Sequence, residues 1–146
     1  MKQRSDNLKR LLPVLAVMAV IFIHSALPAD LSSQESSFIV ELLQKWLPVG
    51  AGPLTFFVRK GAHFLEYAAL GGAIWNYRSA QGTLSSWLAG VLYAGTDELH
   101  QYFVPGRSCE FRDICIDAAG VAAGMLALAA VHRFRRRGNM HRGCQS

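Results

Sequence analysis

Four apolar segments, each close to the length that crosses a bilayer, constrain this chain more than any other feature. They cover about residues 11–27, 54–75, 84–104 and 114–131. A spanning helix needs roughly 20 mostly apolar residues, and 51% of the 146 residues are hydrophobic while only 17% are charged. The sequence therefore predicts an all-α fold, an integral membrane four-helix bundle in a single domain over residues 1–146. A soluble helix bundle is the alternative.

Basic residues predict how the helices cross the membrane, because positive residues beside spans stay in the cytoplasm. Ten of the fifteen Lys and Arg residues precede the first segment, separate the second from the third, or follow the fourth: Lys2, Arg4, Lys9, Arg10, Arg78, Arg133, Arg135, Arg136, Arg137 and Arg142. Both termini, including the basic tail at 132–146, are therefore predicted to be cytoplasmic. Directly after a span, this tail indicates topology and contact with anionic membrane lipids, and no nucleic-acid partner is predicted.

The first segment and the stretch that follows it each have two interpretations. A basic start, an apolar run and small residues near Ser25 also fit a cleaved signal peptide, although residues 25–28 match a cleavage site poorly. Residues 38–47 predict a short amphipathic helix, lying either on the membrane interface or as a lid on the ends of the spans. Ser32 and Glu35 before it have the spacing of a capping box.

Ionisable and polar residues gather at one end of the second, third and fourth segments. Charge inside hydrocarbon is costly and usually marks a functional site, and the predicted topology places all three ends at the outer face. The predicted ligand-binding residues are Lys60, His63, Glu66, Tyr67, Asp97, Glu98, Gln101, Arg107, Arg112, Asp113 and Asp117. His24, the only ionisable residue inside the first segment, is predicted to be structural. Gly71 and Gly72, and the Gly120 and Gly124 pair, predict close helix packing.

The charges of this cluster do not balance. Four cations (Arg59, Lys60, Arg107 and Arg112) face six acids (Glu66, Asp97, Glu98, Glu110, Asp113 and Asp117). We expect Lys60, Arg107 and Arg112 to pair with acids. The two surplus negative charges would be relieved by protonated carboxylates, by protonated His63 and His100, or by a divalent cation. No other cofactor is predicted. The three cysteines, Cys109, Cys115 and Cys144, lack metal-binding spacing and predict no disulfide.

Three spaced motifs carry a family resemblance. They are K-x-x-H-x-x-x-Y from Lys60 to Tyr67, D-E-x-x-Q-x-F-x-P-x-R from Asp97 to Arg107, and D-x-x-x-D-x-x-G-x-x-x-G from Asp113 to Gly124. Together they resemble the VanZ-like family of small bacterial membrane proteins, named for a protein associated with resistance to the glycopeptide teicoplanin. The resemblance implies a multi-pass protein of the bacterial cytoplasmic membrane with a role at its outer face. It supplies no catalytic residues.

Three functions fit these residues. The cluster binds a cell-envelope component, such as a lipid-linked cell-wall precursor, without chemistry. Alternatively, it is the site of a membrane-embedded enzyme, in which Lys60 and Arg107 hold phosphate or carboxylate and His63, Asp97 or Asp117 acts as base or metal ligand. In the third, it is a structural polar network that holds the helices in register. Neither the substrate nor the oligomeric state follows from the sequence.

Overall fold

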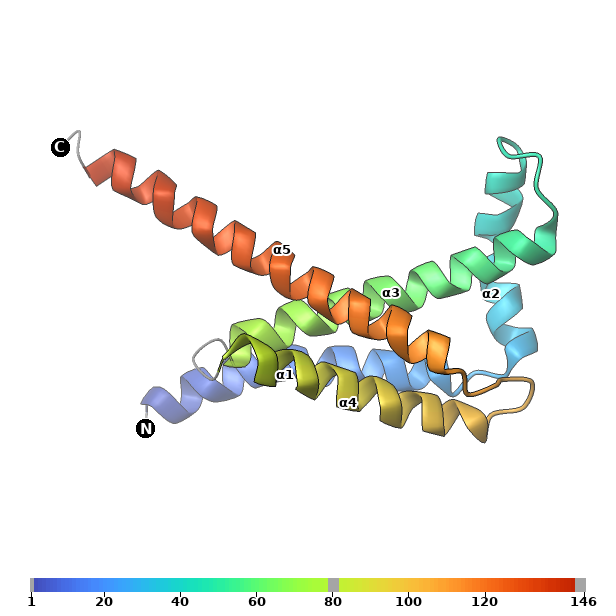
Figure 1. The fold of residues 1–146 in the computed structure, drawn as a ribbon, viewed down its shortest axis with the longest axis horizontal. Helices are drawn as coiled ribbons and strands as arrows, with labels where there is room; N and C mark the ends of the chain where they lie inside the picture. The colour runs from blue at the N-terminus through green and yellow to red at the C-terminus, as the bar shows by residue number, and fades with distance from the viewer. Residues whose placement is uncertain (1, 79–81, 144–146) are drawn as a thin grey trace.

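The computed structural model describes residues 2–78 and 82–143, and this part of the chain forms five α-helices and no β-strand (Figure 1). The helices are α1 (Lys2–Ser25), α2 (Ala29–Gln44), α3 (Ala51–Arg78), α4 (Thr83–Tyr102) and α5 (Phe111–Gly143). The predicted all-α fold is confirmed. Residues 144–146, with Cys144 and the end of the predicted tail, lie outside the described residues, as do the side chains of Lys2, Arg4, Arg137 and Arg142.

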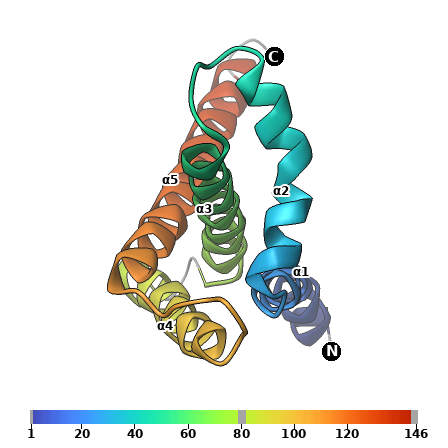
Figure 2. The ribbon, with the colours of Figure 1, turned by 90° about the vertical axis from the view of Figure 1, so that its right-hand side faces the viewer.

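Helix α3 lies at the centre of the arrangement. It crosses α5 closely and also contacts α1, α2 and α4. Seen end-on, α1 and α4 lie on opposite sides below α3, and α2 stands against its first part (Figure 2). The first residues of α1 and the last of α5 lie at the same end of the molecule (Figure 1). The buried core includes Ile21, Leu70, Val121 and Met125, contributed by α1, α3 and α5.

Glycines set how closely α3 and α5 approach. A Cβ atom at Gly124 would overlap the backbone carbonyl of Ala68, and one at Gly120 would lie 2.6 Å from Phe64 O. A Cβ at Gly71 would likewise overlap the Val121 backbone. The predicted close packing is confirmed at these three glycines. Gly72 does not share in it, because a Cβ there would lie 3.6 Å from Gly124 O, at ordinary contact distance.

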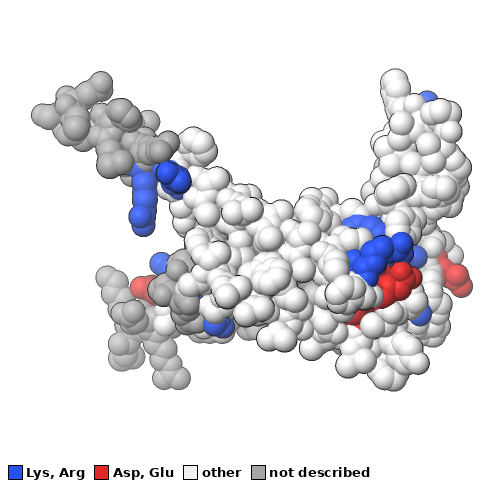
Figure 3. Space-filling model, viewed as in Figure 1, with Lys and Arg blue, Asp and Glu red and all other residues white. Residues whose placement is uncertain are grey.

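The outer surface of the long helices is apolar. Residues 6–25 of α1 and 111–136 of α5 are long and apolar enough to cross a membrane, because they contain 18-residue stretches with mean hydropathies of 1.7 and 2.1, respectively. Large apolar side chains are also exposed on all four long helices, among them Leu12, Leu65, Leu92 and Leu126. Lys, Arg, Asp and Glu lie at the two ends of the visible face and leave the middle uncharged (Figure 3). So extensive an apolar surface requires a covering, and together these features indicate a membrane protein.

The amphipathic helix that follows α1 differs from its prediction. It spans Ala29–Gln44 rather than residues 38–47, so Ser32 lies inside the helix and cannot be its N-cap. The predicted capping box is therefore wrong. Ser hydroxyls inside a helix can bond backward to the preceding turn, and here the Ser33 and Ser36 hydroxyls donate to the carbonyls of Ala29 and Ser32. The polar stretch is thus the first half of the helix.

Candidate functional site

Polar residues of four helices meet at the end of the bundle opposite the termini. They come from the end of α1, the first half of α3, the end of α4, the start of α5 and the α4–α5 loop. Figure 3 shows the same end as a cluster of positive and negative side chains. Its deepest predicted members are at most 6% exposed: Tyr67, Asp97, Glu98, Gln101, Asp113 and Asp117.

A hydrogen-bond network joins α1 to α4. The Ser25 hydroxyl donates to Asp97 Oδ2 at 2.8 Å, and Gln101 Nε2 donates to the same carboxylate oxygen at 3.1 Å. Gln101 Nε2 also lies 3.3 Å from Ser25 Oγ. Ser25 was not predicted as a site residue, because a serine at the end of an apolar segment is an ordinary feature of a span.

Arg107 extends this network to the end of α1. Its guanidinium donates to Gln101 Oε1 at 3.0 Å and to the backbone carbonyls of His24 and Leu27, each at 2.9 Å. The last carbonyls of a helix lack partners within the helix and attract cations. The predicted pairing of Arg107 with an acid is therefore wrong, because three of its five N–H donors bond to these carbonyls and to Gln101 Oε1, and no carboxylate of the described residues forms an ion pair with it. Gly106, with φ at 76°, makes the turn that aims Arg107 at α1.

A second set of contacts joins α3 to α5. Lys60 Nζ forms an ion pair with Asp113 Oδ2, in which the two side chains are 26% and 8% exposed. Arg112 Nη2 donates to Glu110 Oε2 at 2.8 Å, and Arg112 Nε lies 4.0 Å from Asp113 Oδ1. The predicted pairing of Lys60 and Arg112 with acids is confirmed. Glu98 accepts a hydrogen bond from the Glu110 backbone N–H at 3.1 Å, just before α5 begins.

His24, predicted to be a structural residue, contacts the cluster. Its Nδ1 contacts Glu66 Oε1, so Glu66 of α3 faces α1. The predicted topology already placed the end of the first span at the outer face, and this was the signal that sequence reasoning left unused. The His100 ring also contacts α1, because it stacks on Phe22 with the ring centroids 4.5 Å apart.

Several buried polar atoms of the cluster have no hydrogen-bond partner among the described residues. They are His63 Nδ1, the Tyr67 hydroxyl, Asp97 Oδ1, His100 Nδ1, Asp113 Oδ1 and Asp117 Oδ2. Buried polar groups are normally paired, so the cluster is not fully satisfied by its own contacts. Within the described residues, no group of three or more His, Cys, Asp or Glu side chains is placed to hold a metal ion. Cys109 and Cys115 are exposed and free.

Two cavities of about 160 Å³ each open at this end and share Arg59 and Arg107 in their walls. The first lies between α1, α2 and α3 and is lined by His24, His63 and Glu66 among others. The second, which we name the cationic cavity, has four basic and one acidic residue in its wall: Arg59, Lys60, Arg107, Arg112 and Glu110. Each would hold roughly five water molecules at about 30 Å³ apiece.

The cationic cavity favours an anion. Arg59 makes no hydrogen bond or ion pair with another described residue. Burial, and next the neighbouring Arg59 charge, lower the pKa of the Arg107 guanidinium. An arginine still stays charged, and a bound anion would relieve the repulsion. The Phe56 ring lines the same cavity, with the Arg112 guanidinium carbon 5.1 Å and Lys60 Nζ 5.8 Å from its centroid.

Comparisons with known proteins identify the family alone. A family model described as VanZ/LLP1 matches residues 11–132. The match covers every residue of the polar cluster. Searches of curated proteins and of solved structures gave no match.

Proposed function

The chain belongs to the VanZ/LLP1 family, and on that basis we propose that it is a multi-pass membrane protein that binds an anionic group of the cell envelope. In this proposal α1, α3, α4 and α5 cross the bacterial cytoplasmic membrane and α2 lies at its outer interface. Both termini are cytoplasmic, and the polar cluster faces outward. The exposed apolar residues on all four long helices support the crossings.

The observation that carries the proposal is the cationic cavity. Four basic side chains line it and one acid opposes them. Guanidinium groups bind phosphate and carboxylate through paired charge-assisted hydrogen bonds. Arg59 makes no hydrogen bond or ion pair with another described residue, so a ligand that binds it displaces only water and breaks no contact within the protein. A lipid-linked cell-wall precursor presents such anionic groups at this depth and is our proposed ligand.

The cluster has two parts with different roles. Ser25, Asp97 and Gln101 bond to one another and hold α1 against α4, and Gln101 also accepts a hydrogen bond from Arg107 and so positions it. This part fits the structural alternative. The cavity wall supplied by Arg59, Lys60 and Arg112 fits binding. Substitution of Arg59, which bonds to no other described residue, should therefore separate binding from stability.

Binding is tested with the full-length protein in lipid nanodiscs, using a lipid-linked cell-wall precursor as the probe. We expect Arg59→Gln to weaken binding by roughly tenfold or more, since hydrogen bonds to charged groups contribute about 1.5–3 kcal/mol. Its unfolding temperature should stay unchanged, and Arg10→Gln, an exposed arginine at the opposite end, should leave binding intact. Precursor binding that is equal in wild type and Arg59→Gln would contradict the proposal.

The structural role of the network is measured in the same preparation. We expect Asp97→Asn to lower the unfolding temperature, because the buried carboxylate accepts from both Ser25 and Gln101. If Arg59→Gln also unfolds the protein and wild type binds no precursor, the whole cluster is a structural network.

Catalysis is the second candidate, favoured by one observation. His63 lines the cavity between α1, α2 and α3, and its buried Nδ1 lacks a partner among the described residues. A neutral histidine beside a bound ligand is suited to act as a base. An enzyme would turn over the bound precursor, with or without a retained divalent metal, and His63→Ala would abolish turnover while binding persists.

The link to glycopeptides rests on the family resemblance. Occupation of the cationic cavity by a cell-wall precursor would change what teicoplanin meets at the outer face. Expression of the wild-type chain should then raise the teicoplanin concentration that inhibits growth, and Arg59→Gln should remove the increase. Equal inhibition of cells with and without the protein would show that the protein does not act on teicoplanin resistance and has another role in the envelope.

A further inference from the structure

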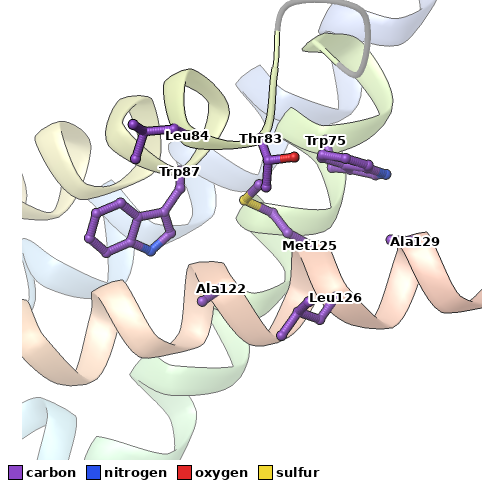
Figure 4. A pocket seen from close by; sticks show the side chains of 8 residues that line it. All are labelled: Trp75, Thr83, Leu84, Trp87, Ala122, Met125, Leu126 and Ala129. Carbon is purple, nitrogen blue, oxygen red and sulfur yellow. The ribbon is translucent and has the colours of Figure 1, made fainter.

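An apolar groove lies in the half of the bundle away from the polar cluster. It has a volume of about 530 Å³ and is lined by the end of α3, the start of α4 and the middle of α5. Figure 4 shows the Trp75 and Trp87 indoles on one side and the small side chains of Ala122 and Ala129 on the other. The two alanines leave the space that longer side chains would fill. Such a volume is within the usual range for a ligand site, about 300–1,000 Å³.

The groove continues into a basic cavity at the end of the molecule that carries both termini. This second cavity, of about 290 Å³, shares Trp75 and Ala129 with the groove and adds His132, Arg133 and Arg136. Ala122 and Arg136 are fourteen positions apart on α5, which corresponds to about 21 Å along a helix. One continuous surface thus passes from apolar to basic along the helix axis.

We propose that this surface binds one anionic phospholipid, with an acyl chain in the groove and the phosphate at Arg133 and Arg136. The order of the two parts matches the order within a lipid, from an apolar chain to a charged headgroup. Trp75 lies where they meet, and tryptophan prefers that depth of a bilayer. Basic pockets between spanning helices are known to hold anionic headgroups. The site is separate from the cationic cavity and does not depend on what binds there.

The headgroup contacts are tested by titrating the detergent-solubilised full-length protein with phosphatidylglycerol and counting retained lipids by native mass spectrometry. Each basic residue near an anionic group contributes about fivefold in affinity, so Arg133→Gln with Arg136→Gln should weaken binding about 25-fold. Arg135→Gln is the matched control, because Arg135 lies between them in sequence but does not line the cavity. It should change affinity by no more than about twofold. Equal losses from all three single substitutions would indicate unspecific attraction and overturn the site.

Contact between the acyl chain and the groove is tested by substitutions on α5. Ala129→Phe fills the point where the two cavities join, whereas Ala130→Phe adds the same ring at a position that lines neither. We expect the first to reduce retention of phosphatidylglycerol and of phosphatidylcholine with the same chains, and the second to leave both unchanged. Equal effects of the two substitutions would contradict binding of an acyl chain in the groove. Tight binding of glycerophosphoglycerol, which has no acyl chain, would contradict it as well. Arg59→Gln should not affect this binding, which separates it from the precursor site.

Discussion

At the scale of single residues, Arg107 shows how one side chain can serve three elements. It lies in the α4–α5 loop, bonds to Gln101 on α4 and closes the end of α1 through the carbonyls of His24 and Leu27. The fork of its guanidinium is what allows all three contacts, because a lysine ammonium cannot span the same acceptors.

We therefore expect Arg107→Lys to reduce the free energy of unfolding by about 2 kcal/mol, as expected for hydrogen bonds lost from a charged donor. The measurement is reversible unfolding in mixed detergent micelles followed by tryptophan fluorescence. Arg59→Lys is the matched control and should stay within about 0.5 kcal/mol of wild type, since Arg59 has no described partner. Equal stability of the two variants would argue against the role given to Arg107.

The Lys60 and Asp113 pair makes a second prediction at this scale. Removing one partner of a buried pair leaves the other uncompensated and costs about 3–5 kcal/mol. Arg112 Nε lies 4.0 Å from Asp113 Oδ1 and partly compensates the Asp113 charge. We therefore expect Lys60→Met to reduce the free energy of unfolding by about 3 kcal/mol, the lower limit of this range. Lys60→Met with Asp113→Leu should recover most of that loss in the same unfolding assay. A double variant no more stable than Lys60→Met would show that the pair is not what stabilises this contact.

At the scale of helices, the contact between α3 and α5 depends on glycine. The sequence pattern correctly predicted Gly120 and Gly124 as a small-residue stripe, but it could not identify the partner residues. These are Phe64 and Ala68, whose backbone carbonyls lie where a Cβ would project. Because the contact is between two backbones, rotation of a side chain cannot relieve it.

Gly124→Ala should accordingly destabilise the protein by about 1–3 kcal/mol, the usual cost of overpacking a well-packed interface. Gly95→Ala on α4 is its control, because a Cβ there meets nothing within 4 Å. That variant should keep or gain stability, up to about 1 kcal/mol from helix propensity. The comparison is made by thermal unfolding of purified protein, and a stable Gly124→Ala variant would mean that α3 and α5 do not pack this closely.

At the scale of the whole molecule, charge is separated along the helix axes. The polar cluster occupies one end, basic residues lie near the other, and an apolar surface separates them (Figure 3). This arrangement fits a chain whose four long helices all cross one bilayer with both termini on the same side. Cys109, exposed in the α4–α5 loop, offers a direct test of the proposed orientation.

In a Cys115→Ser background, a membrane-impermeant maleimide should label Cys109 in intact cells. Cys144, which lies beyond the described residues in the cytoplasmic tail of the proposed topology, should react only after permeabilisation. The Cys109→Ser and Cys144→Ser variants assign the two signals. Labelling of Cys144 alone in intact cells would show that the topology is the reverse of the proposed one, with the cationic cavity facing the cytoplasm.

The sequence by itself determined the properties that depend on neighbours along the chain. Helical class, the apolar segments and the side on which charge accumulates all follow from local composition and periodicity. The predicted extent of the amphipathic helix was wrong, because the serines at 32–37 suit both a cap and a helix that bonds backward. Local sequence does not distinguish the two.

Only the tertiary structure decided which polar residues meet. His24 contacts Glu66 42 positions away, Ser25 contacts Asp97 at 72, and Arg107 reaches back 83 positions to the His24 carbonyl. These pairings depend on how each helix is rotated about its axis and where it crosses the next one. A helix that is apolar on all sides gives no signal of its rotation. Backbone contact between α3 and α5 fixes both quantities for these two helices.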